Sequence, residues 1–167
     1  EIAKAIVDKQ ADYVLCAKAN QPTLLMAIEQ TFALKPLSGT WQDTDADHGR
    51  ITTRTCAVIN DLGLFPELEK WPGLRSIARV DSEVHYKASG KETSMTRYFI
   101  TTLEADAKAI GAAARAHWAV ENGLHWQLDV SFREDASRKR KDHAAINFSA
   151  LTKMTLTMLK RDTSTKV

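Results

Sequence analysis

The chain has 167 residues, of which 44% are hydrophobic and 26% charged, and its net charge is +2. These values are typical of one globular domain with a sizeable core, and no apolar run approaches the roughly 18 residues of a transmembrane helix. The charge is unevenly distributed, because residues 84–167 carry 14 basic and 9 acidic side chains and residues 1–83 carry 9 and 12. The C-terminal half is therefore compatible with a polyanionic partner.

The sequence starts at Glu1 directly in a helical pattern, which indicates a piece of a longer protein. The first residues of this chain do not have the pattern of a secretory signal. The two cysteines, Cys16 and Cys56, both lie in apolar segments of strand length. Buried, reduced thiols are the simplest interpretation of this placement. The sequence therefore predicts a cytoplasmic protein.

The first part of the chain predicts a helix, a strand and a second helix. Residues 1–10 have the spacing of a short amphipathic helix, and residues 12–18 form an apolar run without alternation. Such a run is typical of a buried and often parallel strand. Pro22 suits the first turn of a helix that continues to about Phe32. The proline and glycines of residues 35–49 then predict a loop.

The middle of the chain changes to β-branched segments with partial alternation, at residues 50–59, 74–84 and 95–102. Such segments predict strands, and the turn signals between them favour antiparallel pairing. Residues 65–73 predict a connecting loop with one helical turn. The interpretation is an antiparallel insertion that covers about residues 50–102.

The last part of the chain returns to helix. Residues 104–130 predict one long helix that is rich in alanine at its start, and in which Gly111 and Gly123 indicate close packing. Residues 131–142 are polar, and Asp142 is placed to cap a last helix. The predicted apolar face of this last helix consists of Phe148, Leu151, Met154, Met158 and Leu159. The order of the elements predicts an α/β fold.

The most informative stretch is a polar stripe on the long helix. Four groups recur at every fourth position: His117, Glu121, His125 and Asp129. Each step of four turns a regular helix by about 40°, so the stripe covers about a third of the circumference. An apolar row lies beside it and is expected to pack against the strand of residues 13–17: Val120, Leu124 and Leu128. Glu121 then lies at the rim of the core, where a carboxylate can reach a metal ion.

Three interpretations of this stripe remain open. It can be a solvated helix face with hydrogen bonds between residues four apart. It can hold zinc through His117, Glu121 and His125, although the angle between the two histidines is wide for one small ion. It can also hold a hard divalent cation such as Mg²⁺, which requires further carboxylates from elsewhere in the protein.

An acidic repeat at Asp43, Asp45 and Asp47 has the rhythm of a calcium-binding loop. Such a loop needs glycine and glutamate at the positions that His48 and Arg54 occupy here. The prediction for this segment is therefore a solvated loop.

A basic run follows the long helix and consists of Arg138, Lys139, Arg140 and Lys141. It can be a solvated turn before the last helix. It can also contact phosphate groups of a nucleic acid, because such contacts come mainly from lysine and arginine.

Residues 115–135 resemble the last catalytic block of the DDE transposases of bacterial insertion sequences, and most closely the H-repeat-associated group. Other parts of the chain resemble the same family in the expected order: residues 12–21, 48–54 and 71–77. The resemblance implies a partial ribonuclease-H-like fold with an antiparallel β insertion before the catalytic-type helix. Residues 1–167 would be the C-terminal part of one transposase catalytic domain, with its C-terminal helices over residues 104–161.

The resemblance also implies an active site in which two aspartates and one glutamate hold two Mg²⁺ ions, which Mn²⁺ can replace. Glu121 corresponds to this glutamate, as catalytic residue and metal ligand. Three neighbours become candidates for positioning the glutamate or the DNA: His117, Asn122 and His125. The basic run of residues 138–141 would bind the DNA backbone.

The chain departs from the family in two ways. Both aspartates of the family lie before the position of Glu1, so only one third of the triad is present. The tyrosine, arginine and lysine that often flank the glutamate are replaced by Ala114, His117 and Leu128. The implied function is DNA cleavage and strand transfer by the intact transposase, in a homo-oligomer, with this fragment inactive. The alternatives are a DNA-binding or assembly module without catalysis, and a zinc-dependent hydrolase.

Overall fold

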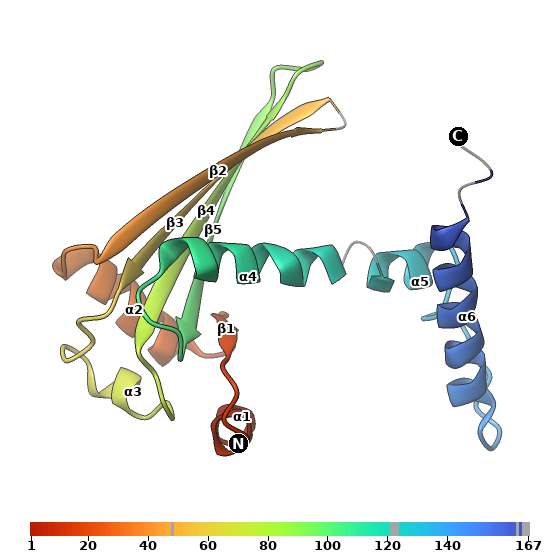
Figure 1. The fold of residues 1–167 in the computed structure, drawn as a ribbon, viewed down its shortest axis with the longest axis horizontal. Coiled ribbons are helices and arrows are strands. Elements are labelled where there is room, and N and C mark those ends of the chain that lie inside the picture. The colour runs from red at the N-terminus through yellow and green to blue at the C-terminus, as the bar shows by residue number, and fades with distance from the viewer. Residues whose placement is uncertain (48, 121–123, 163, 165–167) are drawn as a thin grey trace. The chain divides into compact units, whose positions relative to one another are not determined.

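A computed structural model describes residues 1–47, 49–120, 124–162 and 164. It divides the chain into two compact units, Glu1–Ala114 and Arg115–Val167. The first unit combines helices with a β-sheet and the second contains helices (Figure 1). The α/β class predicted from the sequence is confirmed.

The helices and strands up to the end of the sheet follow one another closely. They are α1 (Ile2–Asp8), β1 (Val14–Ala17), α2 (Pro22–Leu34), β2 (Gly39–Asp47), β3 (Arg50–Ile59), α3 (Pro66–Glu69), β4 (Ser76–Tyr86) and β5 (Glu92–Thr101). The helix α4 (Ala107–Val120) follows the last strand of the sheet. The predicted strands of the middle region, the first two helices and the single helical turn are thereby confirmed.

The five strands form one sheet in the order β1-β5-β4-β3-β2, and every neighbouring pair is antiparallel. The prediction of a parallel strand at residues 12–18 is therefore wrong, because β1 pairs with β5 and places Leu15 opposite Ile100. The run is apolar because both faces of β1 are covered. Leu15 and Ala17 belong to one core cluster, whereas Val14 and Cys16 pack against the other.

The loop predicted at residues 35–49 is also wrong, because most of it forms β2 and pairs with β3 along its whole length. Its three aspartates alternate along this strand and do not form a solvated loop. Asp45 contacts the guanidinium of Arg54 at 2.9 Å. Pairing with β3 overrides the low intrinsic strand preference of aspartate. The antiparallel region thus begins at Gly39.

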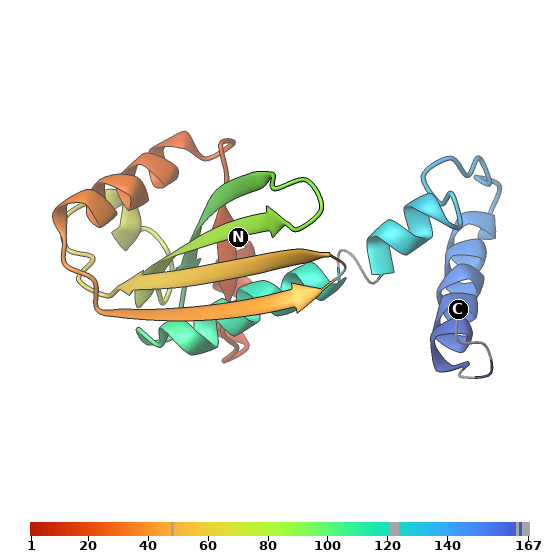
Figure 2. The same cartoon turned by 90° about the horizontal axis from the view of Figure 1, so that it is seen from above.

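Helices cover the sheet on both faces, as Figure 2 shows for α2 and α4. The helices α1, α2 and α3 contribute to a cluster with Ile59, Ile77 and Ile100 of the strands. The helix α4 packs through Ala107, Ile110 and Ala114 against the opposite face. Because side chains alternate along a strand, β1, β3, β4 and β5 serve both clusters, whereas β2 contributes Trp41 to the second.

Close packing at Gly111 is confirmed. A Cβ atom at this position would lie 2.9 Å from Cε3 of Trp41 and 3.2 Å from Cβ of Cys56. The absence of a side chain therefore lets the axis of α4 approach β2 and β3. Gly123 lies outside the described residues.

The second unit contains α5 (Trp126–Val130) and α6 (Ala144–Arg161). Its buried side chains include Leu128, Thr152 and Leu156. The predicted apolar face of α6 is largely exposed, because only Phe148 is half-buried, whereas Leu151, Met154, Met158 and Leu159 are 59–71% exposed. The helix instead buries the side that carries Thr152 and Leu156, since these residues are four apart and lie on one face.

The two free cysteines differ in accessibility, since Cys56 is buried and Cys16 is half-buried. Burial first, and then the charges of Asp106 and Asp81, raise the pKa of the Cys56 thiol from 9.0 to about 11. We expect a thiol reagent such as DTNB to modify Cys16 at pH 8 and to leave Cys56 unmodified until the chain unfolds. The thiolate population of Cys56 at this pH is roughly 100-fold lower than that of an ordinary thiol.

The measurement is the number of thiols modified per chain against time, with Cys16→Ala as the single-thiol control. A rapid phase that persists in this variant would contradict the expectation.

The raised pKa of Cys56 also makes the stability of the fold depend on pH. The unfolded thiol ionises near pH 9 and the folded one near pH 11, so Cys56 stabilises the fold fully below pH 9 and loses this contribution as the pH rises towards 11.

Candidate functional site

The candidate site follows α4, whose start is fixed by a cap. The carboxylate of Asp106 accepts hydrogen bonds at 3.0 Å from the backbone N–H groups of Lys108 and Ala109. Capping of this kind stabilises a helix start by about 1 kcal/mol. The buried face of α4 packs against the sheet. The C-terminal end of α4 leads directly to the residues of the polar stripe.

The polar stripe is divided between two helices. His117 is exposed in the last turn of α4, whereas His125 and Asp129 are exposed at the start of α5. Glu121 and Asn122 lie outside the described residues, so their predicted roles stay predictions. The structure supplies no hydrogen bond from the His125 side chain to the start of α5.

The single regular helix predicted for residues 104–130 is wrong in two respects. The helix α4 begins at Ala107, and Leu124 and His125 adopt the wider turn of a π-helix before α5. Because a π-turn changes the angle between successive side chains, the regular stripe derived from 100° per residue is not kept. Leu128 is buried within the second unit, and the packing of Val120 and Leu124 against the sheet stays a prediction.

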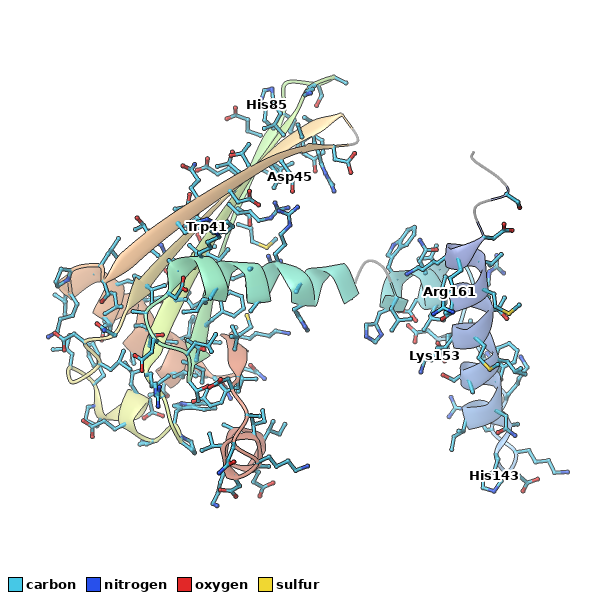
Figure 3. All side chains as sticks on the ribbon, viewed as in Figure 1. Trp41, Asp45, His85, His143, Lys153 and Arg161 are labelled. Carbon is cyan, nitrogen blue, oxygen red and sulfur yellow. The ribbon has the colours of Figure 1, made fainter. Side chains whose placement is uncertain are left out.

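No group of three or more histidine, cysteine, aspartate or glutamate side chains gathers to hold a metal ion within the described part of the chain. The zinc set of His117, Glu121 and His125 includes a residue outside that part, so it stays a prediction. Asp45 and His85 lie on the extended strands of the sheet, away from its helical covering (Figure 3). There Asp45 pairs with Arg54, and His85 lies 3.2 Å from Glu92.

The basic run lies in the connection between α5 and α6, and all four of its side chains are exposed. One of them also has a structural contact, because the ammonium of Lys139 lies 3.7 Å from the ring centre of Phe148 in α6. Such a cation–π contact at an exposed site contributes about 0.5–1 kcal/mol. Lys139 thus ties the connection to α6 while its three neighbours extend from the same segment.

The predicted cap of α6 is wrong. Asp142 has a φ of +48° and lies one residue before the N-cap, which is His143 and makes no side-chain capping bond. The left-handed backbone at Asp142 ends the basic run with a turn. Lys153 and Arg161 add cationic side chains along α6 (Figure 3).

The charge of the second unit is clearly positive. Residues 115–167 carry ten basic and six acidic side chains, and residues 1–114 carry thirteen and fifteen. A positive surface around the basic run favours polyanions.

The basic run was predicted from the sequence, but a groove at the edge of β1 was not. The uncharged, apolar segment of residues 14–17 was a signal for this groove. No described helix is both long and apolar enough to cross a membrane.

Comparisons with known proteins agree with these features. A family model described as a transposase DDE domain matches residues 1–158. "Putative transposase YncI" of Escherichia coli O157:H7 is 39% identical over 167 residues, which cover 96% of this chain and 43% of YncI. "H repeat-associated putative transposase YhhI" of Escherichia coli K12 is 34% identical over 171 residues, covering 97% of this chain and 45% of YhhI.

"Putative protein YbfL" of the same strain is also 34% identical, again over 97% of this chain and 45% of YbfL. The chain therefore spans less than half the length of the curated relatives that it matches. No solved structure shows a significant match. The predicted membership of the DDE transposase family is confirmed.

Proposed function

The chain belongs to the transposase DDE domain family, and on this premise we propose that it is the C-terminal part of the catalytic domain of an insertion-sequence transposase. The observation that carries this proposal is the family match over residues 1–158. The substrate is DNA, whose strands the intact enzyme cleaves and transfers in a complex of several copies. The compartment is the cytoplasm, where Cys16 and Cys56 stay free.

The architecture supports a partial ribonuclease-H-like fold with a β insertion. The antiparallel strands β2 to β5 precede α4, and the sequence places Glu121 directly after the last residue of that helix. We assign Glu121 as the catalytic carboxylate and metal ligand. His117, Asn122 and His125 are positioning residues for this glutamate or for the DNA.

The family implies Mg²⁺, with Mn²⁺ as a substitute, but the residues of this chain do not fit a two-metal centre. The described part contains no convergent set of ligands, and Glu121 alone cannot hold two ions about 3.5–4 Å apart. When bound in an intact transposase, the ions supply an activated oxygen nucleophile and charge stabilisation.

The DNA contacts of this chain come from the basic run, Arg138, Lys139, Arg140 and Lys141. Its exposure and its place after the Glu121 segment support contacts to backbone phosphates. This same observation favours a second candidate function, namely a DNA-binding or assembly module without catalysis. A zinc-dependent hydrolase has no comparable support among the described residues.

We expect this chain to leave supercoiled plasmid DNA intact in Mg²⁺ or Mn²⁺. The physical reason is the missing pair of carboxylates, since one ligand does not assemble two ions. The measurement is conversion of supercoiled to nicked plasmid, compared among the wild type, Glu121→Ala and, as a remote control, Glu92→Ala. Nicking by the wild type and Glu92→Ala, but not by Glu121→Ala, would show instead that this chain is active alone.

A further inference from the structure

The second unit exposes much apolar surface for its size. Although it spans only residues 115–167, it contains half of the large hydrophobic side chains that are exposed: Trp126, Val130, Ile146, Leu151, Met154, Met158 and Leu159. Among its described residues only Leu128, Thr152 and Leu156 are buried. Large exposed apolar patches on soluble proteins mark interaction sites.

Most of the exposed apolar side chains of α6 lie on one side of the helix. Thr152 and Leu156 face the small core of the unit. The opposite side, which we call the exposed arc of α6, covers about 140° of the helix when successive residues turn by about 100°. Its members are Ile146, Leu151, Met154 and Met158. The described residues of the second unit therefore leave this arc uncovered.

The hydroxyl groups near the exposed arc already have partners inside α6. The hydroxyl of Thr155 donates to the carbonyl of Leu151 at 2.9 Å, and that of Thr157 donates to the carbonyl of Lys153 at 2.8 Å. A donor that loses water on burial without gaining a partner is strongly destabilising. Because these donors bond to the preceding turn, covering the arc leaves neither of them unpaired.

The two helices of the second unit carry opposite charges. The charged residues of α6 are all basic, namely Lys153, Lys160 and Arg161, two of which are labelled in Figure 3. The helix α5 places an exposed Asp129 beside the exposed Trp126 and Val130. Two α6 helices side by side would bring like charges together. An α6 helix against an α5 helix instead brings apolar groups and opposite charges together.

We propose that the exposed arc of α6 in one copy packs against α5 of a second copy, and that a two-fold axis repeats this contact with the roles exchanged. A two-fold interface requires a self-complementary surface, and the second unit carries both halves of this contact. The repetition also helps to reach the about 800 Å² per partner that stable interfaces bury. The inference rests on the proposed function, in which several copies of a transposase act together.

Sedimentation velocity of the 167-residue chain, without DNA or metal, tests the dimer at concentrations up to about 100 μM. We expect a species of twice the 18.6 kDa of one chain. Met154→Gln combined with Met158→Gln should weaken dimerisation at least about 100-fold, because each dimer loses four buried apolar side chains. The matched control is Met26→Gln combined with Met95→Gln, since these methionines of the first unit are also exposed, by 53% and 52%. It should leave the dimer intact.

A wild-type chain that stays monomeric throughout would overturn the proposal, and so would equal dimerisation of the two double variants. Thermal melting is also recorded at a concentration where the wild type is monomeric. If the variant at Met154 and Met158 then melts clearly lower than the wild type, the arc is covered within its own chain and the proposal fails. These outcomes do not decide membership of the transposase family, which rests on the sequence match.

An exchange of charges tests which helices meet. Asp129→Lys and Lys153→Glu each place like charges across the contact, so each should weaken dimerisation by up to about tenfold. Their combination restores opposite charges and should recover most of the lost affinity. Asp129→Lys combined with Lys9→Glu is the control, because Lys9 is exposed in the first unit, and it should show no recovery. Independent effects of Asp129→Lys and Lys153→Glu would overturn the pairing of α5 with α6.

Discussion

Neutralising the four charges of the basic run is expected to weaken duplex DNA binding by up to about 10³-fold at 0.1 M salt. The variant replaces Arg138, Lys139, Arg140 and Lys141 with glutamine. Each phosphate contact contributes about 0.9 to the slope of log affinity against log salt, so the slope should become less steep by up to about four. The loss should be similar for unrelated duplexes, because contacts to phosphate carry no sequence information.

The measurement is a salt titration of binding to two unrelated duplexes. A matched control replaces four exposed lysines of the first unit with glutamine and changes the net charge equally: Lys9, Lys87, Lys91 and Lys108. Its slope should change much less. Equal changes of slope in the two variants would mean that the basic run contributes only through the net charge of the chain. Thermal melting is measured in parallel, since Lys139 also contacts the ring of Phe148.

The sequence predicts most of the first unit because its periodicities reflect burial. The β-branched segments of residues 50–59 and 95–102 form β3 and β5, whose last residues are buried in both core clusters, with Ile59 and Ile100 in one and Val58 and Phe99 in the other. The failure at residues 39–47 has a different cause. The aspartates of β2 have a low strand preference by themselves, and pairing with β3 and the contact of Asp45 with Arg54 help to stabilise the strand.

The candidate site could be predicted less well from the periodicity of the sequence. The predicted position of Glu121 at the rim of the core requires one regular helix, and the π-turn at Leu124 and His125 interrupts that regularity. The sequence pattern does not signal such a turn. The apolar face predicted for α6 is present but not buried, because Met154 and Met158 share a helical face and remain exposed within the described structure. Periodicity finds a face of a helix, and only tertiary contacts decide whether this face is buried.

Substituting Gly111 should test how closely α4 approaches the sheet. Alanine at a helix interior normally stabilises by up to about 1 kcal/mol relative to glycine. Here the added Cβ would lie 2.9 Å from the ring of Trp41 and 3.2 Å from Cβ of Cys56, and overpacking of this kind costs about 1–3 kcal/mol. We therefore expect Gly111→Ala to lower the free energy of unfolding by about 1–2 kcal/mol and Gly111→Leu to lower it further.

Urea unfolding monitored by tryptophan fluorescence and circular dichroism measures this change. Gly63→Ala is the matched control, because a Cβ there has no neighbour within 4 Å, and its effect should stay within about 0.5 kcal/mol. Trp41→Leu combined with Gly111→Ala completes a double-mutant cycle. The leucine removes the clashing ring atoms, so the alanine should then cost less than it does beside Trp41. A Gly111→Ala variant that is more stable than the wild type would mean that helix propensity outweighs packing, and that α4 lies farther from β2 and β3 than the structure places it.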